Sequence, residues 1–112
     1  MSVDEPFYRT LRHYVHSKDT VVEFGSGLST LACLGAERYV GFEQDAAQCM
    51  RFPEQYRPRH CPIGRDGWYE IDTFIPKPDI LVVDGPFHHP VSRYNGLKIL
   101  ASLTAFARVV MV

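Results

Sequence analysis

The sequence lacks any uninterrupted apolar run near the roughly 20 residues that a membrane-spanning helix requires. Its first ten residues, MSVDEPFYRT, carry acids where a secretory signal peptide carries bases and an apolar stretch. The three cysteines, Cys33, Cys49 and Cys61, show no CxxC or Cys/His spacing, which favours reduced thiols over a disulfide framework or a zinc site. We therefore expect a cytoplasmic protein without membrane contact.

The net charge is also small, because the 12 Lys and Arg residues nearly balance the 13 Asp and Glu residues. A net charge of −1 excludes a strong overall attraction to nucleic acid or to anionic membranes. Internal repeats, low-complexity segments and linkers are absent as well, and 46% hydrophobic with 22% charged residues is typical of globular proteins. We expect a single domain over residues 1–112.

The apolar runs that are present are short and nearly continuous, which is typical of parallel strands buried on both faces. Helical segments separate most of them. This order predicts an α/β fold: a three-layer, doubly wound, Rossmann-like domain with a mainly parallel sheet. The expected helices cover 4–17, the segment after Gly27, 45–52 and 93–106, and the expected strands cover 20–24, 38–43, 59–63, 79–84 and 108–112.

Helical spacing also predicts which side chains face the sheet. In the helix after Gly27, one face is expected to hold Leu28, Leu31, Ala32 and Gly35. In the helix over 93–106, the inward residues are expected to be Leu97, Leu100, Ala101 and Leu103.

The most informative segment is TVVEFGSGLST, residues 20–30, in which a strand runs directly into Gly25-Ser26-Gly27 and then into a helix. Gly25 permits a sharp turn, and Gly27 lets a ligand approach the backbone closely. The unpaired N–H groups at a helix start favour a polar or anionic ligand end. The pattern indicates a nucleotide-type site, and the structural alternative is a tight strand–helix turn.

Dinucleotide-binding folds require a third glycine where this chain has Thr30. Glu23 instead precedes the first glycine by two residues, giving the E-x-G-x-G pattern of Rossmann-like methyltransferases. A carboxylate there suits an ammonium-bearing ligand such as S-adenosylmethionine better than a pyrophosphate. Glu43 ends the second strand 18 residues after Gly25, which suits an acid that binds ribose hydroxyls.

The segments VVEFGSGLST, YVGFEQD and DILVVDGP together resemble the class I (Rossmann-like) S-adenosylmethionine-dependent methyltransferases over about residues 18–112. The resemblance implies a sheet that begins with strand order 3-2-1-4-5, and against the family pattern the chain is expected to be truncated after the fifth strand. It also implies a set of cofactor contacts. These are Glu23, Gly25, Ser26 and Gly27 for the methionine part, Glu43 for the ribose, and the segment 64–66 with Asp66 for the adenine.

The candidate catalytic residues follow the strand over 79–84. Asp84 ends that strand beside the point where such sheets bind ligands, and the resemblance places this position near the methyl group. We expect Asp84 to orient or deprotonate the acceptor, and a turn-capping role is the structural alternative. His88 lies in the following loop, and an unperturbed histidine is suited to act as a base at neutral pH. Asp84, His88 and His89 show no further ligand nearby in sequence, so no metal is expected.

The predicted function is methyl transfer from S-adenosylmethionine to an unidentified acceptor, expected to be a small molecule. Two alternatives stay open: a non-catalytic cofactor-binding or assembly module with this fold, and an NAD(P)-dependent oxidoreductase. The last strand, RVVMV, is an apolar edge in the order 3-2-1-4-5. Such an edge predicts a homodimer through the C-terminal strand or an aggregation-prone monomer.

Overall fold

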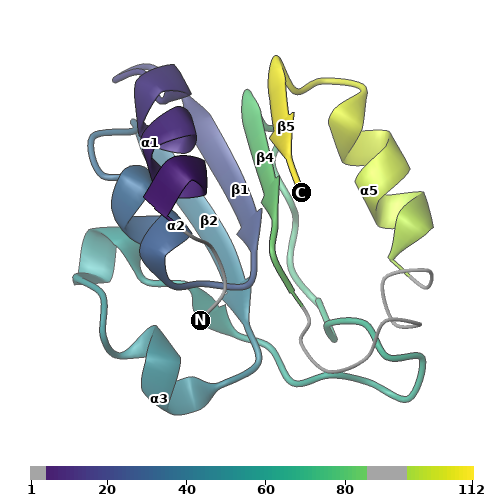
Figure 1. The fold of residues 1–112 in the computed structure, drawn as a ribbon. Helices are drawn as coiled ribbons and strands as arrows, with labels where there is room; N and C mark the ends of the chain where they lie inside the picture. Colours follow the sequence, from purple (N-terminus) through teal and green to yellow (C-terminus); the bar gives the residue numbers. More distant parts are fainter. Residues whose placement is uncertain (1–4, 86–95) are drawn as a thin grey trace.

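A computed structural model describes residues 5–85 and 96–112 of the chain. Its strands form one parallel sheet in the order β3-β2-β1-β4-β5, which confirms the predicted fold class and strand order (Figure 1). The chain starts at the centre of the sheet and winds outward in both directions, so β1 and β4 meet at the switch point. The strands are β1 (Thr20–Phe24), β2 (Arg38–Glu43), β3 (Arg59–His60), β4 (Ile80–Val83) and β5 (Val109–Met111).

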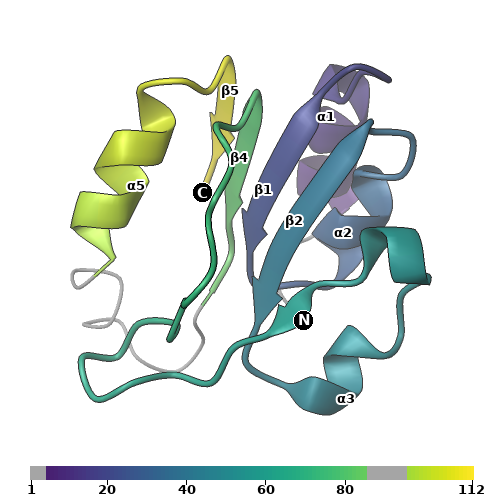
Figure 2. The ribbon, with the colours of Figure 1, turned by 180° about the vertical axis from the view of Figure 1, so that it is seen from behind.

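Helices lie on both faces of this sheet (Figures 1 and 2). α1 and α2 lie on one face over β1 and β2, and α5 lies on the other face, nearest β5. Within the described residues, no helix is both long and apolar enough to cross a membrane. The helical elements are α1 (Glu5–Tyr14), α2 (Leu28–Ala32), α3 (Ala46–Cys49), the 3-10 turn η1 (Glu54–Tyr56) and α5 (Leu97–Thr104).

β1 shows why the strands read as continuous apolar runs. Val21 packs in the core cluster shared with α1 and α2, whereas Val22 and Phe24 pack in the cluster on the α5 side. All three side chains are fully buried, because neither pleat face of the strand reaches solvent. Glu23 is equally buried, and by alternation its side chain lies on the α1–α2 side with Val21.

Two predicted helix faces are right only in part. In α2, Ala32 is fully buried as expected, but Leu31 is 41% exposed, while Ser29 and Thr30 are fully buried. Gly35, expected on the same face, lies beyond the end of α2 and is exposed. The helix turns its hydroxyl-bearing side inward because Glu23 lies beneath it and needs donors. In α5, Leu103 is buried as expected, but Ala101 is exposed.

The predicted third strand is shorter than expected. β3 covers Arg59–His60, and Cys61 still donates its backbone N–H to Glu43 O at 2.8 Å. The ladder ends there because Asp45 N, the next donor along the chain on this edge of β2, donates to the Glu43 side chain at 2.9 Å. Ile63 pairs instead with Tyr69 in an antiparallel bridge.

Candidate functional site

Backbone contacts bring the carboxyl ends of β1, β2 and β4 to one edge of the sheet. Gly25 N donates to Phe42 O at 2.8 Å, and Asp84 N donates to Phe24 O at 2.8 Å. A Cβ at Gly25 would lie 3.0 Å from Gly85 N, and Gly25 has a φ of +88°. Only glycine fits this close approach at a positive φ without strain. The glycine loop therefore lies between the ends of β2 and β4, at the switch point.

Glu43 joins the glycine loop to the segment after β2. Its Oε1 accepts from Ser26 N at 3.0 Å and from Ser26 Oγ at 2.6 Å, and its Oε2 accepts from Asp45 N at 2.9 Å. The side chain is buried, with 4% exposed. Asp45 caps α3 by accepting from Ala47 N and Gln48 N, as the sequence predicted for the start of that helix. The carboxylate that we expect to bind ribose thus lies directly on Ser26.

Glu23 lies beneath the same loop and receives three hydroxyl donors. Its Oε1 accepts from Thr30 Oγ1 at 2.6 Å and from Tyr39 Oη at 2.5 Å, and its Oε2 accepts from Ser29 Oγ. Burial raises the pKa of Glu23 to about 7; the three hydroxyls act to lower it, and the charge of Asp84 adds to the rise. The structure gives Glu23 an anchoring contact with α2 that the sequence did not indicate, and its role toward the methionine part stays a prediction.

Asp66 lies in a hairpin formed by residues 62–70. Gly64 N donates to Trp68 O at 2.8 Å, Glu70 N donates to Pro62 O at 2.9 Å, and Asp66 Oδ1 accepts from Trp68 N at 3.0 Å. One side of the hairpin borders an open groove of about 720 Å³. The groove is lined by Gly64, Arg65, Asp66, Tyr69, Glu70, Ile71 and Asp72.

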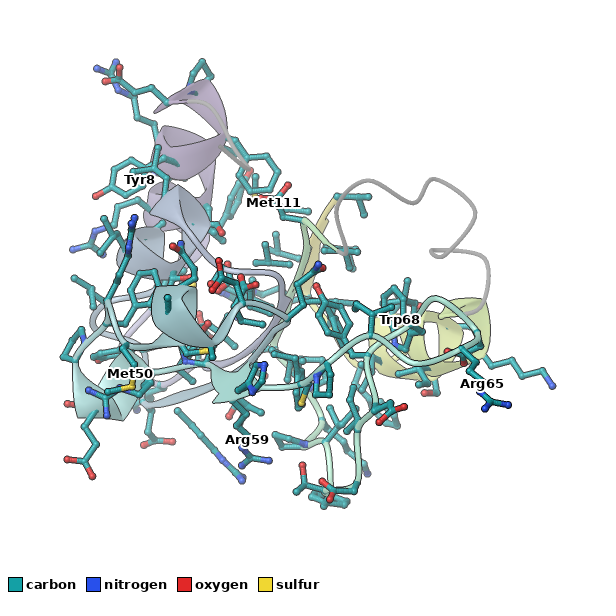
Figure 3. The ribbon with its side chains drawn as sticks, turned by 90° about the horizontal axis from the view of Figure 1, so that it is seen from below. Tyr8, Met50, Arg59, Arg65, Trp68 and Met111 are labelled. Carbon is teal, nitrogen blue, oxygen red and sulfur yellow. The ribbon has the colours of Figure 1, made fainter. Side chains whose placement is uncertain are left out.

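Two aromatic rings fix this hairpin against the carboxyl edge. A Cβ at Gly96 would lie 2.6 Å from the Trp68 ring, and a Cβ at Gly85 would lie 2.2 Å from Tyr69 Oη. Trp68 is 1% exposed and lies 5.2 Å from Phe24 between ring centroids. Figure 3 shows Trp68 beside α5 and Arg65 pointing away from the molecule. Trp68 is therefore a residue of the hydrophobic core.

The candidate catalytic residues are described only in part. Asp84 is half-buried at the end of β4, beside Gly85 and the glycine loop. His88 and His89 lie outside the described residues. Over residues 5–85 and 96–112, no group of three His, Cys, Asp or Glu side chains is placed to hold a metal ion.

The cysteines are free and buried in the structure. Burial raises the thiol pKa of Cys33, of Cys61 and of Cys49, in the last case to about 11. Thiols with raised pKa values are poor nucleophiles at neutral pH. The candidate site therefore depends on its carboxylates, hydroxyls and backbone groups.

No family model and no curated protein sequence matches the chain. Among solved structures, the chain is similar to the crystal structure of a dimethyladenosine transferase from Plasmodium falciparum, with a TM-score of 0.57 and 14% sequence identity. The match covers 88% of this chain and 38% of that chain. At this identity the likeness shows a shared fold.

Proposed function

We propose that the carboxyl edge of the sheet binds S-adenosylmethionine and that the chain transfers its methyl group to an acceptor. The observation that carries this proposal is the position of Glu43, whose buried carboxylate lies on Ser26 of the glycine loop at 2.6 Å. The structural neighbour, a dimethyladenosine transferase, supports transfer of a methyl group as the class of reaction.

The residues at this edge fit such a cofactor. A carboxylate has about four lone-pair sites, and Glu43 uses three of them for Ser26 and Asp45, so it can accept from a ribose hydroxyl. Ser26 Oγ can turn toward the ligand while Ser26 N keeps its bond to Glu43. Gly25 and Gly27 keep the loop free of side chains, and we assign them to the methionine part together with Ser26 and Glu23. Asp66, in the groove of the 62–70 hairpin, is our candidate on the adenine side.

When bound, the cofactor supplies a methyl group already activated by the sulfonium, so the protein mainly has to align the reactants. Asp84 directly follows β4 next to Gly25 and is our candidate for orienting the acceptor or taking its proton. His88 is assigned to the same task by its place in the sequence. The acceptor is proposed to be a small molecule.

Calorimetric titration with S-adenosylhomocysteine tests the proposal. Glu43→Ala should weaken binding about tenfold or more, because one charge-assisted hydrogen bond contributes about 1.5–3 kcal/mol. Glu37→Ala is the matched control, since Glu37 is exposed and precedes β2 at the opposite end of the sheet. Glu43→Gln, which retains an acceptor for Ser26, separates loss of charge from collapse of the loop.

The alternatives give different results in the same titration. Binding of nicotinamide dinucleotide without binding of S-adenosylhomocysteine would support an oxidoreductase and contradict the proposal. Tight binding of S-adenosylhomocysteine without turnover on any acceptor would leave a non-catalytic module. Equal affinities of Glu43→Ala and the wild type for S-adenosylhomocysteine would show that Glu43 does not bind the cofactor.

A further inference from the structure

Thr30 has two hydrogen bonds that connect the glycine loop to the core. Its Oγ1 accepts from Gly27 N at 3.1 Å and donates to Glu23 Oε1 at 2.6 Å. Thr30 is fully buried, so water cannot replace either partner. Gly27 precedes α2 with φ 154° and ψ −134°, a backbone conformation that side-chain-bearing residues rarely adopt. A single hydroxyl therefore joins a loop position that requires glycine to a buried carboxylate.

The other end of this connection is held by β2. Tyr39 Oη donates to Glu23 Oε1 at 2.5 Å. The ring reaches this position because Gly41, which pairs with Glu23 across the two strands, has no side chain; a Cβ there would lie 2.1 Å from Tyr39 Oη. Hydrogen bonds thus run without interruption from Gly27 through Thr30 and Glu23 to Tyr39, that is, from the glycine loop to β2.

We infer that Thr30 is a positioning residue for the glycine loop. Its hydroxyl connects the buried Glu23 carboxylate to the Gly27 amide, and this connection, which we call the relay, fixes the loop in its binding shape. The inference rests on the proposed function for what the loop binds, but the relay itself is a property of the protein alone. Thr30 occupies the position of the third glycine in dinucleotide-binding folds, where glycine serves close helix–strand packing. Here a hydrogen-bonding side chain takes that place.

Ser29 offers a comparison within the same cluster. It donates to Glu23 Oε2 and so shares the carboxylate with Thr30, but none of its described hydrogen bonds reaches Gly27. Removing the Ser29 hydroxyl takes one donor from Glu23, whereas removing the Thr30 hydroxyl also leaves the Gly27 amide without its acceptor. The two residues therefore distinguish general support of the carboxylate from the relay to the loop.

The charge state of Glu23 gives the relay a measurable signature. The ionised carboxylate can accept from all three hydroxyls, whereas the protonated carboxyl must donate through one oxygen and rearrange its partners. The titratable groups facing Glu23 are Tyr39, Cys33 and Asp84. Burial raises the pKa of Tyr39 and of the Cys33 thiol well above their usual values, and burial raises the pKa of Glu23 itself to about 7. Tyr39 and Cys33 therefore keep their protons near neutral pH, and Glu23→Gln distinguishes a change at Glu23 from one at Asp84.

The relay is tested first without ligand, by NMR of the Gly27 amide between pH 5.5 and 8.5. In the wild type we expect its chemical shift to titrate with a midpoint near 7 and its hydrogen exchange to be slow. Thr30→Val should speed exchange about tenfold, the effect of one lost hydrogen bond, and abolish the titration. Thr30→Ser should restore both properties, and Ser29→Ala should keep Gly27 protected.

Glu23→Gln keeps the inference testable if Thr30→Val does not fold. It should abolish the titration of the Gly27 amide while leaving the amide slow to exchange. Unchanged exchange in Thr30→Val, equal effects of Thr30→Val and Ser29→Ala, or a titration that survives Glu23→Gln would each overturn the relay.

Titration with S-adenosylhomocysteine then separates the relay from the proposed function. We expect Thr30→Val to weaken binding about tenfold, and Thr30→Ser and Ser29→Ala to bind nearly as the wild type does. Wild-type affinity in Thr30→Val would overturn the positioning role and leave the proposed function intact. No binding to the wild type, together with the expected behaviour of the Gly27 amide, would overturn the proposed function and leave the relay standing.

Discussion

Glu23 and Glu43 are buried carboxylates on neighbouring strands with different partners. Glu43 receives two backbone N–H groups and one hydroxyl, from Ser26 and Asp45. Glu23 receives hydroxyls alone, from Ser29, Thr30 and Tyr39. Hydroxyls can reorient to accept as well as donate, so the surroundings of Glu23 tolerate either protonation state. The two residues are thus suited to different tasks: Glu43 to binding at the surface of the loop, and Glu23 to support beneath it.

The raised pKa of Glu23 predicts a pH-dependent stability. Because its pKa is about 7 in the folded protein against 4.5 in the unfolded chain, the folded state holds the proton more tightly. The resulting stabilisation is fully present below pH 4.5 and is lost as the pH rises through 7, by up to about 3 kcal/mol. Glu23→Gln has no proton to lose, so its stability relative to the wild type should increase between pH 5 and pH 8.

Urea unfolding at the two pH values measures this difference. Glu37→Gln is the control, because Glu37 is exposed and its variant should follow the wild type at both pH values. Parallel changes of stability in Glu23→Gln and the wild type would contradict the raised pKa.

Asp84 is predicted to matter more for turnover than for folding. Asp84→Asn preserves size and the backbone bond from Asp84 N to Phe24 O, but it removes the basic carboxylate. Once an acceptor is identified, the rate of methyl transfer should fall at least a hundredfold, the usual contribution of general acid–base catalysis. The melting temperature and the affinity for S-adenosylhomocysteine should change little. Equal losses of stability and rate would instead assign Asp84 to the turn before Gly85.

At the scale of elements, the sequence predicted those structural features that depend only on the local pattern of apolar and polar residues. The strands β1, β2 and β4 were recognisable because both of their faces are largely apolar and buried, and the position of Glu43 at the sheet edge was predictable because an acid ends a buried strand there. The contact of Tyr39 with Glu23 was not predictable, because it depends on the register that places Gly41 opposite Glu23. Nor was the inward polar face of α2 predictable from periodicity, because Ser29 and Thr30 turn inward to donate to the buried Glu23.

The 62–70 hairpin supplies a prediction at this scale, through the packing of Trp68 on Gly96. Gly96→Ala should be destabilising by about 1–3 kcal/mol, because the added Cβ would lie 2.6 Å from the indole ring. Gly96 has φ −89°, so backbone strain does not contribute. Trp68→Phe opens space at the same point, and the double variant should be more stable than the sum of the single effects implies. Urea unfolding of the four proteins measures the coupling, and strict additivity would show that the ring does not rest on Gly96.

At the scale of the whole molecule, the two edges of the sheet differ. β3 carries Arg59 and His60, both exposed, and a short charged edge discourages pairing with another chain. In the part of the chain that the structure describes, β5 pairs with β4 alone, and Val110 is 42% exposed. The far end of the sheet is held by Arg108, whose guanidinium donates to both carboxylate oxygens of Asp19, at 2.8 and 2.9 Å. β5 is thus firmly placed but presents an apolar edge.

We predict that this edge pairs two copies of the chain as a homodimer, and Val110→Lys tests the prediction. A lysine at the centre of β5 would bring two positive charges together across a two-fold axis and should shift the protein to the monomer. Ala101→Lys is the matched control, because Ala101 is exposed on α5 and receives the same charge away from the edge. Light scattering at high micromolar concentration should show a dimer for the wild type and for Ala101→Lys, but not for Val110→Lys. A monomeric wild type, or a dimer that persists in Val110→Lys, would exclude the β5 edge as the interface, since neither result is compatible with strand pairing at Val110.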